Sequence, residues 1–323
     1  MSSYDEIDLR GVKPIPLKRR KNKVAVDDFA RLARGRSFKD FWESLPDILA
    51  AKEIKILVQA IHKARGRGKP IIWFMGAHVI KAGLSPLIID LMKHGYITAV
   101  GLNGAGMIHD VEIAMIGGTS EDVAEGIKDG VFGMAEETAK FINCTVMENA
   151  AKGCGLGEAA GMAIEKEKLP HRKYSILAAG YRLKIPCTVH LAIGTDIVHE
   201  HPSFNAAAAG EATYRDFKIM ANQIAKIGGG GVIVNAGSAV ILPLIIEKSI
   251  SVARNLGHSV KNFTGANLDF IRHYRSQLNP VQRAIELGGK GISIIGHHEL
   301  TIPLIYWALQ NEGISRKGAK KSV

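Results

Sequence analysis

The stretch AVGLNGAG at residues 99–106 is a short apolar run that ends abruptly in small and polar residues. A run of this length is typical of a buried strand, and the glycines that follow let the backbone turn and approach a ligand closely. A helix that begins after such a turn offers free N–H groups and positive potential to an anion. We therefore interpret residues 99–106 as a strand followed by a turn that can form a site.

The same pattern of short strands and longer helices continues along the chain. It predicts strands near residues 71–75, 97–102, 174–177, 187–192, 231–235 and 291–295, and helices near residues 79–94, 121–141, 157–168, 211–227, 239–256 and 299–310. This alternation is typical of a parallel sheet that is covered on both faces. The predicted fold class is α/β, with a Rossmann-like doubly wound parallel sheet in three α/β/α layers.

Small or polar residues follow most of the predicted strands. In an open parallel sheet, ligands bind in a crevice beyond the carboxyl ends of the strands. We therefore expect a single crevice bordered by the turns Gly76-Ala77-His78, Asn103-Gly104-Ala105-Gly106, Gly194-Thr195-Asp196, Asn235-Ala236-Gly237-Ser238 and Gly296-His297-His298.

The chain has 323 residues, of which 46% are hydrophobic, so a large core is expected. We predict one domain at residues 24–310, preceded by a basic extended arm at residues 1–23 and followed by a basic tail at residues 311–323. No apolar stretch reaches the ~20 residues that a membrane span needs, and the acidic start lacks the order of a secretory signal. A cytoplasmic protein without membrane contact is expected.

The formal net charge of +11 comes mainly from the two ends of the chain. Nine Lys and Arg residues lie in runs at residues 18–23 and 316–321, and removing them from the 42 basic residues leaves 33 against 31 acidic ones. We interpret both runs as solvated tails, with an arm for nucleic acid or an acidic partner as the less favoured alternative. The three cysteines form no CxxC pair, which argues against a disulfide framework and a cysteine-ligated zinc.

Five segments resemble deoxyhypusine synthase, in the same order, over about residues 65–310. Residues 74–84 (FMGAHVIKAGL) resemble the family's first cofactor turn, and residues 99–106 with the following Asp110 resemble its second strand and turn. Residues 184–196 resemble the strand that ends in the family's Thr-Asp pair. Residues 231–238 resemble its triple-glycine turn, and residues 300–304 (LTIPL) resemble its Leu-Val-Phe-Pro-Leu run.

The resemblance implies an enzyme with NAD-dependent transfer or redox chemistry on an amine or another small substrate. In that family NAD takes a hydride from a polyamine carbon, a lysine captures the imine, and the aminobutyl group passes to an acceptor amine. A homo-oligomer, either a dimer or a tetramer, is also implied, because the family builds its sites between subunits. The implied NAD-binding residues are Gly76, Ala77, His78, Asn103, Gly104, Ala105, His109, Asp196, Ala236, Gly237, Ser238, Thr264 and Gly265.

The substrate side departs from the family's pattern. The family's Trp-Gly-Lys motif has no counterpart, and Lys290 is near it in order but displaced in spacing. Lys81 and Lys290 are the candidate nucleophiles, although an ordinary surface lysine is the favoured interpretation of each. The family's acidic residue after the Thr-Asp pair is replaced by His201, and an imidazole does not hold a polyamine ammonium as a carboxylate does. We expect a rebuilt pocket and no efficient deoxyhypusine synthase activity.

Six histidines fall at predicted strand-end turns and are expected to line one crevice: His78, His109, His199, His201, His297 and His298. Histidine acts as an acid or base near neutral pH, and neutral imidazoles bind zinc. The candidate catalytic residues are His201, His297, Asp196 and Lys290. His199 and His201 are the candidate zinc ligands, with ordinary hydrogen bonding as the alternative.

Two other functions remain open from the sequence. The fold could host a histidine-assisted or metal-assisted hydrolase or lyase, because folds of this type carry many chemistries. It could also belong to a dinucleotide-binding regulator without turnover.

Overall fold

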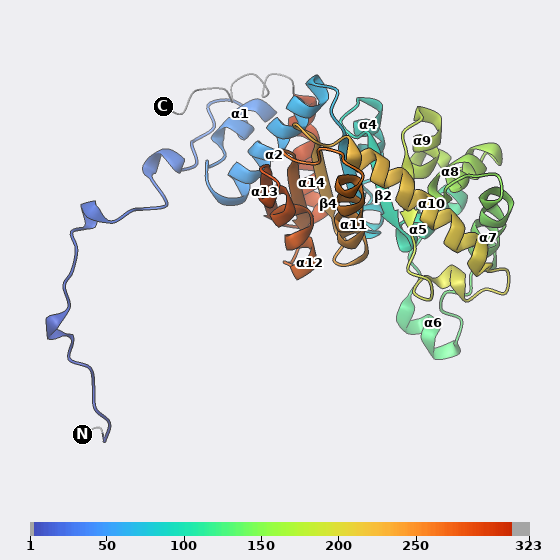
Figure 1. Cartoon of the computed structure of the whole chain (residues 1–323), viewed down its shortest axis with the longest axis horizontal. Coiled ribbons are helices and arrows are strands. Elements are labelled where there is room, and N and C mark those ends of the chain that lie inside the picture. The colour runs from blue at the N-terminus through green and yellow to red at the C-terminus, as the bar shows by residue number, and fades with distance from the viewer. Residues whose placement is uncertain (1–2, 312–323) are drawn as a thin grey trace.

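The computed structural model describes residues 3–311 and centres on one six-stranded sheet (Figure 1). All strands are parallel, and their order is β3-β2-β1-β4-β5-β6. The strands are β1 (Ile71–Met75), β2 (Ala99–Asn103), β3 (Cys187–His190), β4 (Val232–Ala236), β5 (Thr264–Asp269) and β6 (Lys290–Ile295). Helices cover both faces, which confirms the predicted α/β doubly wound fold.

Every connection between consecutive strands contains a helix, as parallel pairing requires. The α-helices are α1 (Phe38–Ser44), α2 (Leu49–Gly66), α3 (His78–Lys81), α4 (Ser85–Lys93), α5 (Gly104–Ile116), α6 (Val123–Asp129), α7 (Glu136–Ala150), α8 (Leu156–Lys166), α9 (Ile176–Leu183), α10 (Ala206–Ala225), α11 (Ile241–Asn255), α12 (Tyr274–Ser276), α13 (Arg283–Glu286) and α14 (His298–Gln310). Within residues 3–311, none of these helices has the length and apolar character to cross a membrane.

Alternation along β1 divides its side chains between two hydrophobic clusters. Ile71, Trp73 and Met75 pack on the face that α2, α4 and α14 cover, whereas Ile72 and Phe74 pack against α10 and α11 on the other face. All five side chains are buried. The strand is apolar throughout because neither face meets water.

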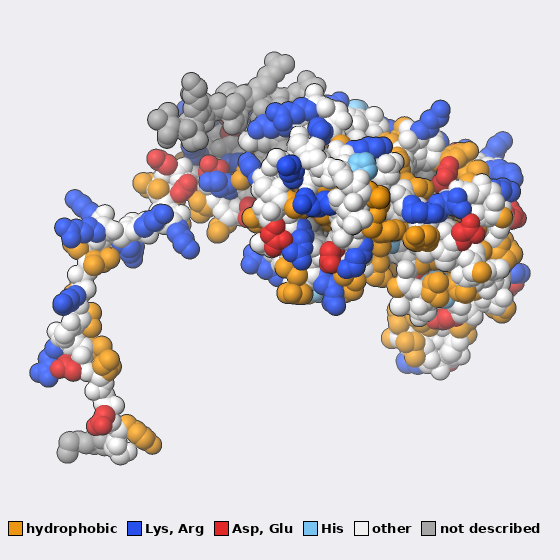
Figure 2. Space-filling view, viewed as in Figure 1, with side chains coloured by type: hydrophobic (Ala, Val, Ile, Leu, Met, Phe, Trp, Pro, Cys, Tyr) orange, Lys and Arg blue, Asp and Glu red, His pale blue; other side chains and the backbone are white. Residues whose placement is uncertain are grey.

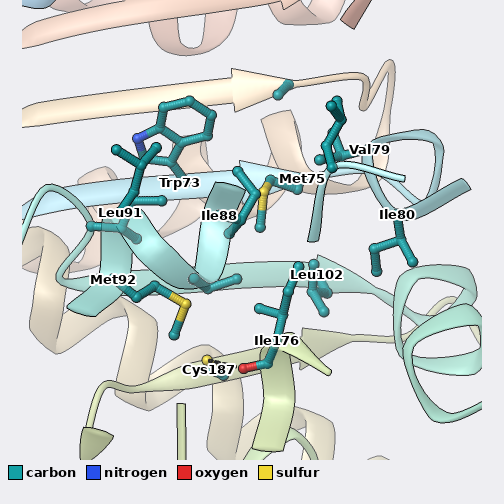
Figure 3. Packing of buried hydrophobic residues seen from close by; sticks show 14 of the residues in the cluster. Trp73, Met75, Val79, Ile80, Ile88, Leu91, Met92, Leu102, Ile176 and Cys187 are labelled. Carbon is teal, nitrogen blue, oxygen red and sulfur yellow. Dashed lines mark hydrogen bonds between the residues drawn. The ribbon is translucent and has the colours of Figure 1, made fainter. Parts of the chain in front are cut away.

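The larger cluster fixes helix α4 on the sheet. Trp73 and Met75 lie beside Ile88, Leu91 and Met92 of that helix, and all five side chains are almost completely buried (Figure 3). Burying a side chain of this size contributes ~1.5–3 kcal/mol. This packing holds β1 and α4 together, and with them the turn that joins the carboxyl end of β1 to α3.

Residues 3–27 run away from the body as an extended arm (Figure 1). Its side chains are exposed, and Lys and Arg are prominent along it (Figure 2). Residues 28–31 already bond to the end of α1 and the segment after it, because the carbonyl of Asp28 accepts from the N–H of Asp47 and the N–H of Arg31 donates to the carbonyl of Ser44. Ser37 caps α1, the first α-helix, by accepting a hydrogen bond from the N–H of Asp40. The division of the chain into arm, domain and tail stays a prediction, and the predicted tail falls, except for Asn311, outside the described residues.

Residues 174–177 do not form the predicted strand, because Tyr174 ends a 3-10 turn, Ser175 caps helix α9, and the helix begins at Ile176. Asp110 explains the difference, because its carboxylate accepts hydrogen bonds from the hydroxyl of Ser175 and from the N–H groups of Ile176 and Leu177. Asp110 is fully buried, and this burial raises its pKa to about 6 against the opposing effect of the hydrogen bonds. A side chain 65 positions earlier thus decides where α9 starts.

Strand β5 is absent from the prediction. Its sequence, TGANLD, has a single β-branched residue, Thr264, and contains the strand-disfavouring Gly265 and Asn267. The segment nevertheless pairs in register with β4 on one side and β6 on the other, and every residue in it is buried. Tertiary pairing therefore overrides local preference here.

We predict that Asp110→Ala lowers the free energy of unfolding by at least about 3 kcal/mol, because three buried donors lose their acceptor at about 1–3 kcal/mol each. Urea unfolding followed by circular dichroism measures this change. Glu286→Ala is the control, because this exposed side chain only makes an ion pair with Arg283 and a hydrogen bond with Gln282, so its loss should change the free energy of unfolding far less than the loss of the Asp110 carboxylate. Equal losses in the two variants would contradict the capping role.

Candidate functional site

The middle of the sheet is a topological switch point. The chain passes from β1 to β2 and β3 on one side, whereas β4, β5 and β6 lie on the other side. Doubly wound sheets bind ligands where the strand order reverses in this way. Here the turns after β1 and β4 meet, and the N–H of Gly76 donates a hydrogen bond of 2.9 Å to the carbonyl of Ala236.

Close packing of these two turns requires glycine at both. A Cβ atom on Gly76 would lie 2.1 Å from the carbonyl oxygen of Gly237, and one on Gly237 would lie 2.6 Å from Cε1 of His298. Gly237 also has a φ of +68°, which favours glycine. The predicted cofactor turns at residues 76–78 and 236–238 are thus side by side, and their glycines serve contacts within the chain.

The turn after β2 carries a carboxylate from another loop. Asn103 caps α5 by accepting a hydrogen bond of 2.9 Å from the N–H of Gly106. Asp196 lies over the start of the same helix, because a Cβ atom on Gly104 would be 2.0 Å from its Oδ2 and the N–H of Ala105 donates to its carboxylate. The protein itself therefore supplies the negative charge at the N-terminus of α5.

Asp196 titrates closer to neutral pH than an ordinary aspartate. Its side chain is 9% exposed, and its Oδ2 atom is buried without a hydrogen-bond partner within residues 3–311. Burial raises the pKa of Asp196 to about 6, against the opposing hydrogen bond from Ala105. This carboxyl group can therefore take up a proton in the pH range where enzymes exchange protons with substrates.

Asp196 borders a pocket of about 200 Å³ at the carboxyl ends of β2 and β3. The pocket lies among α3, α5 and the segment that carries α6, here called the α6 lobe (residues 117–135), which projects from the body (Figure 1). Mostly apolar pockets with a few polar groups are typical of small-molecule sites. The apolar walls include Ala105, Ile108, Phe132 and Ile197, and the polar groups include Lys81, His109, Glu112 and Asp196.

His109, Thr119 and Glu112 form a chain of polar contacts at this pocket. Nδ1 of His109 lies 2.6 Å from Oγ1 of Thr119, and the Thr119 hydroxyl donates to the Glu112 carboxylate. Thr138 donates to the second carboxylate oxygen at 3.3 Å. Burial raises the pKa of Glu112, but the interactions with His109, Thr119 and Thr138 outweigh it and hold that pKa below its usual value. Glu112 is therefore ionised at neutral pH.

The six histidines do not line one crevice. His109 borders the Asp196 pocket, and Nε2 of His199 lies 3.9 Å from Oδ2 of Asp196. A second group lies beyond β1, β5 and β6, where the rings of His78 and His298 are 5.6 Å apart and the ring of His297 stacks on Phe270 at 6.3 Å. His201 belongs to neither group.

His199 and His201 do not form the predicted zinc site. Nδ1 of His199 accepts hydrogen bonds from the N–H groups of Gly194 and Asp196, and Nδ1 of His201 pairs with the hydroxyl of Ser203 at 2.8 Å. Across the part of the chain that the structure describes, no group of three His, Cys, Asp or Glu residues could hold a metal ion. Their observed contacts are those of ordinary hydrogen-bonding histidines.

Three predicted site residues lie at the wrong edge of the sheet. Thr264 and Gly265 are the first residues of β5, and Lys290 is the first residue of β6, where it pairs in register with Thr264. They are therefore at the amino ends of the strands, opposite the crevice. His297 is at the correct edge but exposed, so Asp196 alone among the predicted catalytic residues borders the pocket.

Glu112, Thr119 and Phe132 are absent from the sequence prediction. Glu112 follows His109 by three positions on α5, a spacing that places two side chains on one helix face, so this pair could have been found. Thr119 lies beyond the end of the helix, and only the left-handed conformation of Gly117, with a φ of +73°, turns the chain back toward His109. Phe132 comes from the α6 lobe and has no local sequence signal.

The fold has counterparts among solved structures. No protein-family model and no curated protein sequence matches the chain. Among solved structures, a candidate LOR/SDH protein from Methanococcus maripaludis S2 is 18% identical with a TM-score of 0.50, covering 82% of this chain and 70% of that one. A variant of AgrE bound to L-arginine is 15% identical with a TM-score of 0.51, covering 81% of this chain and 32% of that one.

A candidate deoxyhypusine synthase from Entamoeba histolytica is 10% identical with a TM-score of 0.49, covering 85% of this chain and 93% of that one. This chain spans about a third of the length of AgrE. At such low identities the likeness shows a common fold and nothing finer. The class that the comparisons define is a doubly wound α/β protein whose fold also occurs in the LOR/SDH and AgrE structures.

We predict that Gly104→Ala displaces Asp196, because the new Cβ atom would overlap its carboxylate. The melting temperature should fall by several degrees, as expected for about 1–3 kcal/mol of overpacking. Gly210→Ala is the control, since this glycine in α10 has open space around its Cβ position and alanine is the better helix former. Differential scanning calorimetry compares the two, and no loss in Gly104→Ala would refute the close contact.

Proposed function

We propose that this protein is an NAD-dependent enzyme, related to deoxyhypusine synthase, that carries out a transfer or redox reaction on an amine or another small substrate. The observation that supports it best is the strand order β3-β2-β1-β4-β5-β6 with glycine turns meeting at its switch point. AgrE has a solved complex with ornithine and NAD⁺. That complex describes AgrE, and the proposal for this chain rests on its own turns and pocket.

The turns after β1 and β4 fit a dinucleotide better than the turn after β2. Nε2 of His298 pairs with the carbonyl of Leu268 at 3.1 Å, so it carries the proton, and Nδ1 is a buried acceptor without a partner among residues 3–311. This atom lies beside Gly237, but the His298 side chain is completely buried, so a ligand at these turns would contact the exposed His78 instead. At the start of α5, Asp196 would repel a pyrophosphate. The residues that would hold NAD are therefore Ala77, His78, Gly237 and Ser238.

Bound NAD would accept a hydride from the substrate. The chain's own residues would transfer the proton. With its pKa of about 6, Asp196 can hold a proton or release it during turnover. Apolar walls that include Ile108 and Phe132 limit the access of water to this group. Lys81 at the same pocket provides a positive charge that can attract an anionic or electron-rich part of the substrate.

The substrate is proposed to differ from that of deoxyhypusine synthase. Aminobutyl transfer through an enzyme-bound imine needs a desolvated lysine at a fixed place. Lys290 is exposed and at the opposite edge of the sheet, so Lys81 is the lysine that can serve this pocket. The homo-oligomer also stays a proposal, which is supported by exposed apolar side chains on the α6 lobe, including Val123, Ile127 and Val131.

We predict that isothermal titration calorimetry detects NAD binding to the wild-type protein at submillimolar concentration. Ala77→Glu should weaken the affinity at least about tenfold, because it adds a carboxylate at the turn that would hold the anionic dinucleotide, and tenfold corresponds to about 1.4 kcal/mol. Ala207→Glu adds the same charge at the exposed first turn of α10 and should bind like the wild type. The absence of binding at millimolar NAD would overturn the cofactor assignment.

We also predict that incubation with NAD, spermidine and an acceptor amine yields neither NADH nor aminobutyl transfer at a useful rate. Absorbance at the NADH band and mass spectrometry of the acceptor measure the two products. Lys290→Ala should behave like the wild type in every assay, because its side chain lies at the far edge of the sheet. Rapid transfer by the wild-type protein would show that the pocket still accepts a polyamine.

A further inference from the structure

The end of helix α5 brings three polar side chains together at the pocket. The helix stops at Ile116, and Gly117 adopts a left-handed conformation with its N–H bonded to the carbonyl of Ile113. Ser120 also has a positive φ, of +72°. Between these two turns the chain bends back, so that Thr119 reaches His109 and Glu112 on the preceding turns of the helix.

The direction of the hydrogen bonds follows from what each group can donate. Glu112 is ionised at neutral pH, and an ionised carboxylate only accepts. Thr119 has a single hydroxyl proton and donates it to Glu112. The contact of 2.6 Å between Oγ1 of Thr119 and Nδ1 of His109 can then be a hydrogen bond only if Nδ1 carries a proton and donates it.

A neutral imidazole carries one proton, so a proton on Nδ1 leaves the lone pair on Nε2. Among residues 3–311, Nε2 of His109 has no hydrogen-bond partner, and the ring borders the pocket together with Asp196 and Lys81. The side chain is 16% exposed, which leaves this nitrogen open to a small molecule. The ring is thus held in the tautomer that a proton acceptor needs.

We propose that His109 is the general base of this pocket and that Thr119 and Glu112 are positioning residues that keep its proton on Nδ1. The proposal rests on the proposed function, because it assumes that the pocket binds a substrate. Nε2 takes a proton from an N–H or O–H group of the substrate, and the electron pair of that bond stays on the substrate atom. The imidazolium that forms donates from Nδ1 to Thr119.

The carboxylate of Glu112 stabilises this imidazolium. Its Oε2 atom is 3.8 Å from Nδ1, and both side chains are only 16% exposed, so water screens the attraction weakly. The Thr119 hydroxyl accepts a hydrogen bond from Nδ1 of His109 and donates its own proton to Glu112, so the carboxylate attracts the positive ring through this hydroxyl. Asp196 borders the same pocket with its pKa of about 6, so an imidazole and a carboxyl group are both available to one substrate.

Long-range ¹H–¹⁵N NMR of protein labelled with ¹⁵N-histidine tests the tautomer without any ligand. His109→Gln identifies the His109 signals by their loss. At pH 7.5 the wild-type signals should show a protonated Nδ1 and an unprotonated Nε2. Thr119→Val removes the acceptor and should shift the ring toward the tautomer with the proton on Nε2, whereas Thr119→Ser keeps the hydroxyl and should restore the wild-type pattern.

A wild-type spectrum with the proton on Nε2 would overturn the proposal, even if Thr119→Val does not fold. An unchanged tautomer in a folded Thr119→Val protein would also overturn it. Circular dichroism shows whether each variant is folded. Failure of NAD binding would contradict the proposed function but leave these spectra as they are, so the two results are distinguishable.

Carbethoxylation tests whether the lone pair on Nε2 is open to a reagent. Diethyl pyrocarbonate reacts with unprotonated imidazole nitrogens, and peptide mass spectrometry reports each site. The exposed His258 serves as an internal reference for reagent activity, and the fully buried His190 as the unreactive reference. His109 should react in the wild-type protein, and a His109 as inert as His190 would contradict the proposal.

Discussion

Helices cover both faces of the sheet, and this single constraint governs the rest of the structure. A strand such as β1, with all five side chains buried, has no place for a polar group along its length. Polar side chains inside the sheet must find partners there, as Asn235 of β4 does by donating to Asn267 of β5, and most of the remaining polar groups collect at the strand ends. At the carboxyl edge the turns after β1, β2 and β4 carry His78, Asn103 and Ser238, and the loop after β3 carries Asp196.

At the carboxyl edge of the sheet, the position of Asp196 decides how readily its carboxyl group takes up a proton. Its carboxylate lies over the start of α5, where the N–H of Ala105 reaches it, and burial keeps its pKa near 6. A helix N-terminus favours negative charge, whereas burial disfavours it. The balance between the two effects gives a carboxyl group that can change protonation near neutral pH. The same placement leaves no room for a phosphate at α5 and shifts the proposed dinucleotide toward β1 and β4.

Much of the architecture was predictable because it depends on local patterns. Apolar runs bounded by glycine-rich turns identified β1, β2, β3, β4 and β6 to within about two residues, and helical spacing identified α8, α11 and α14. Two errors in the predicted secondary structure have specific causes. Asp110 converts residues 174–177 into the start of a helix, and pairing between β4 and β6 makes a strand of a segment with weak propensity. Neither cause is visible within a short window of sequence.

The sequence by itself determined the parallel α/β fold, the glycine turns and the presence of Asp196 at a strand end, because hydrophobic periodicity and turn residues act over a few neighbours. Only the tertiary structure decided which of these groups share a pocket. It separated His201, His297 and Lys290 from Asp196, and it joined His109, Thr119 and Glu112 across the end of α5. The physical reason is that a site is a set of distances between segments far apart in the chain, and these distances depend on packing between elements.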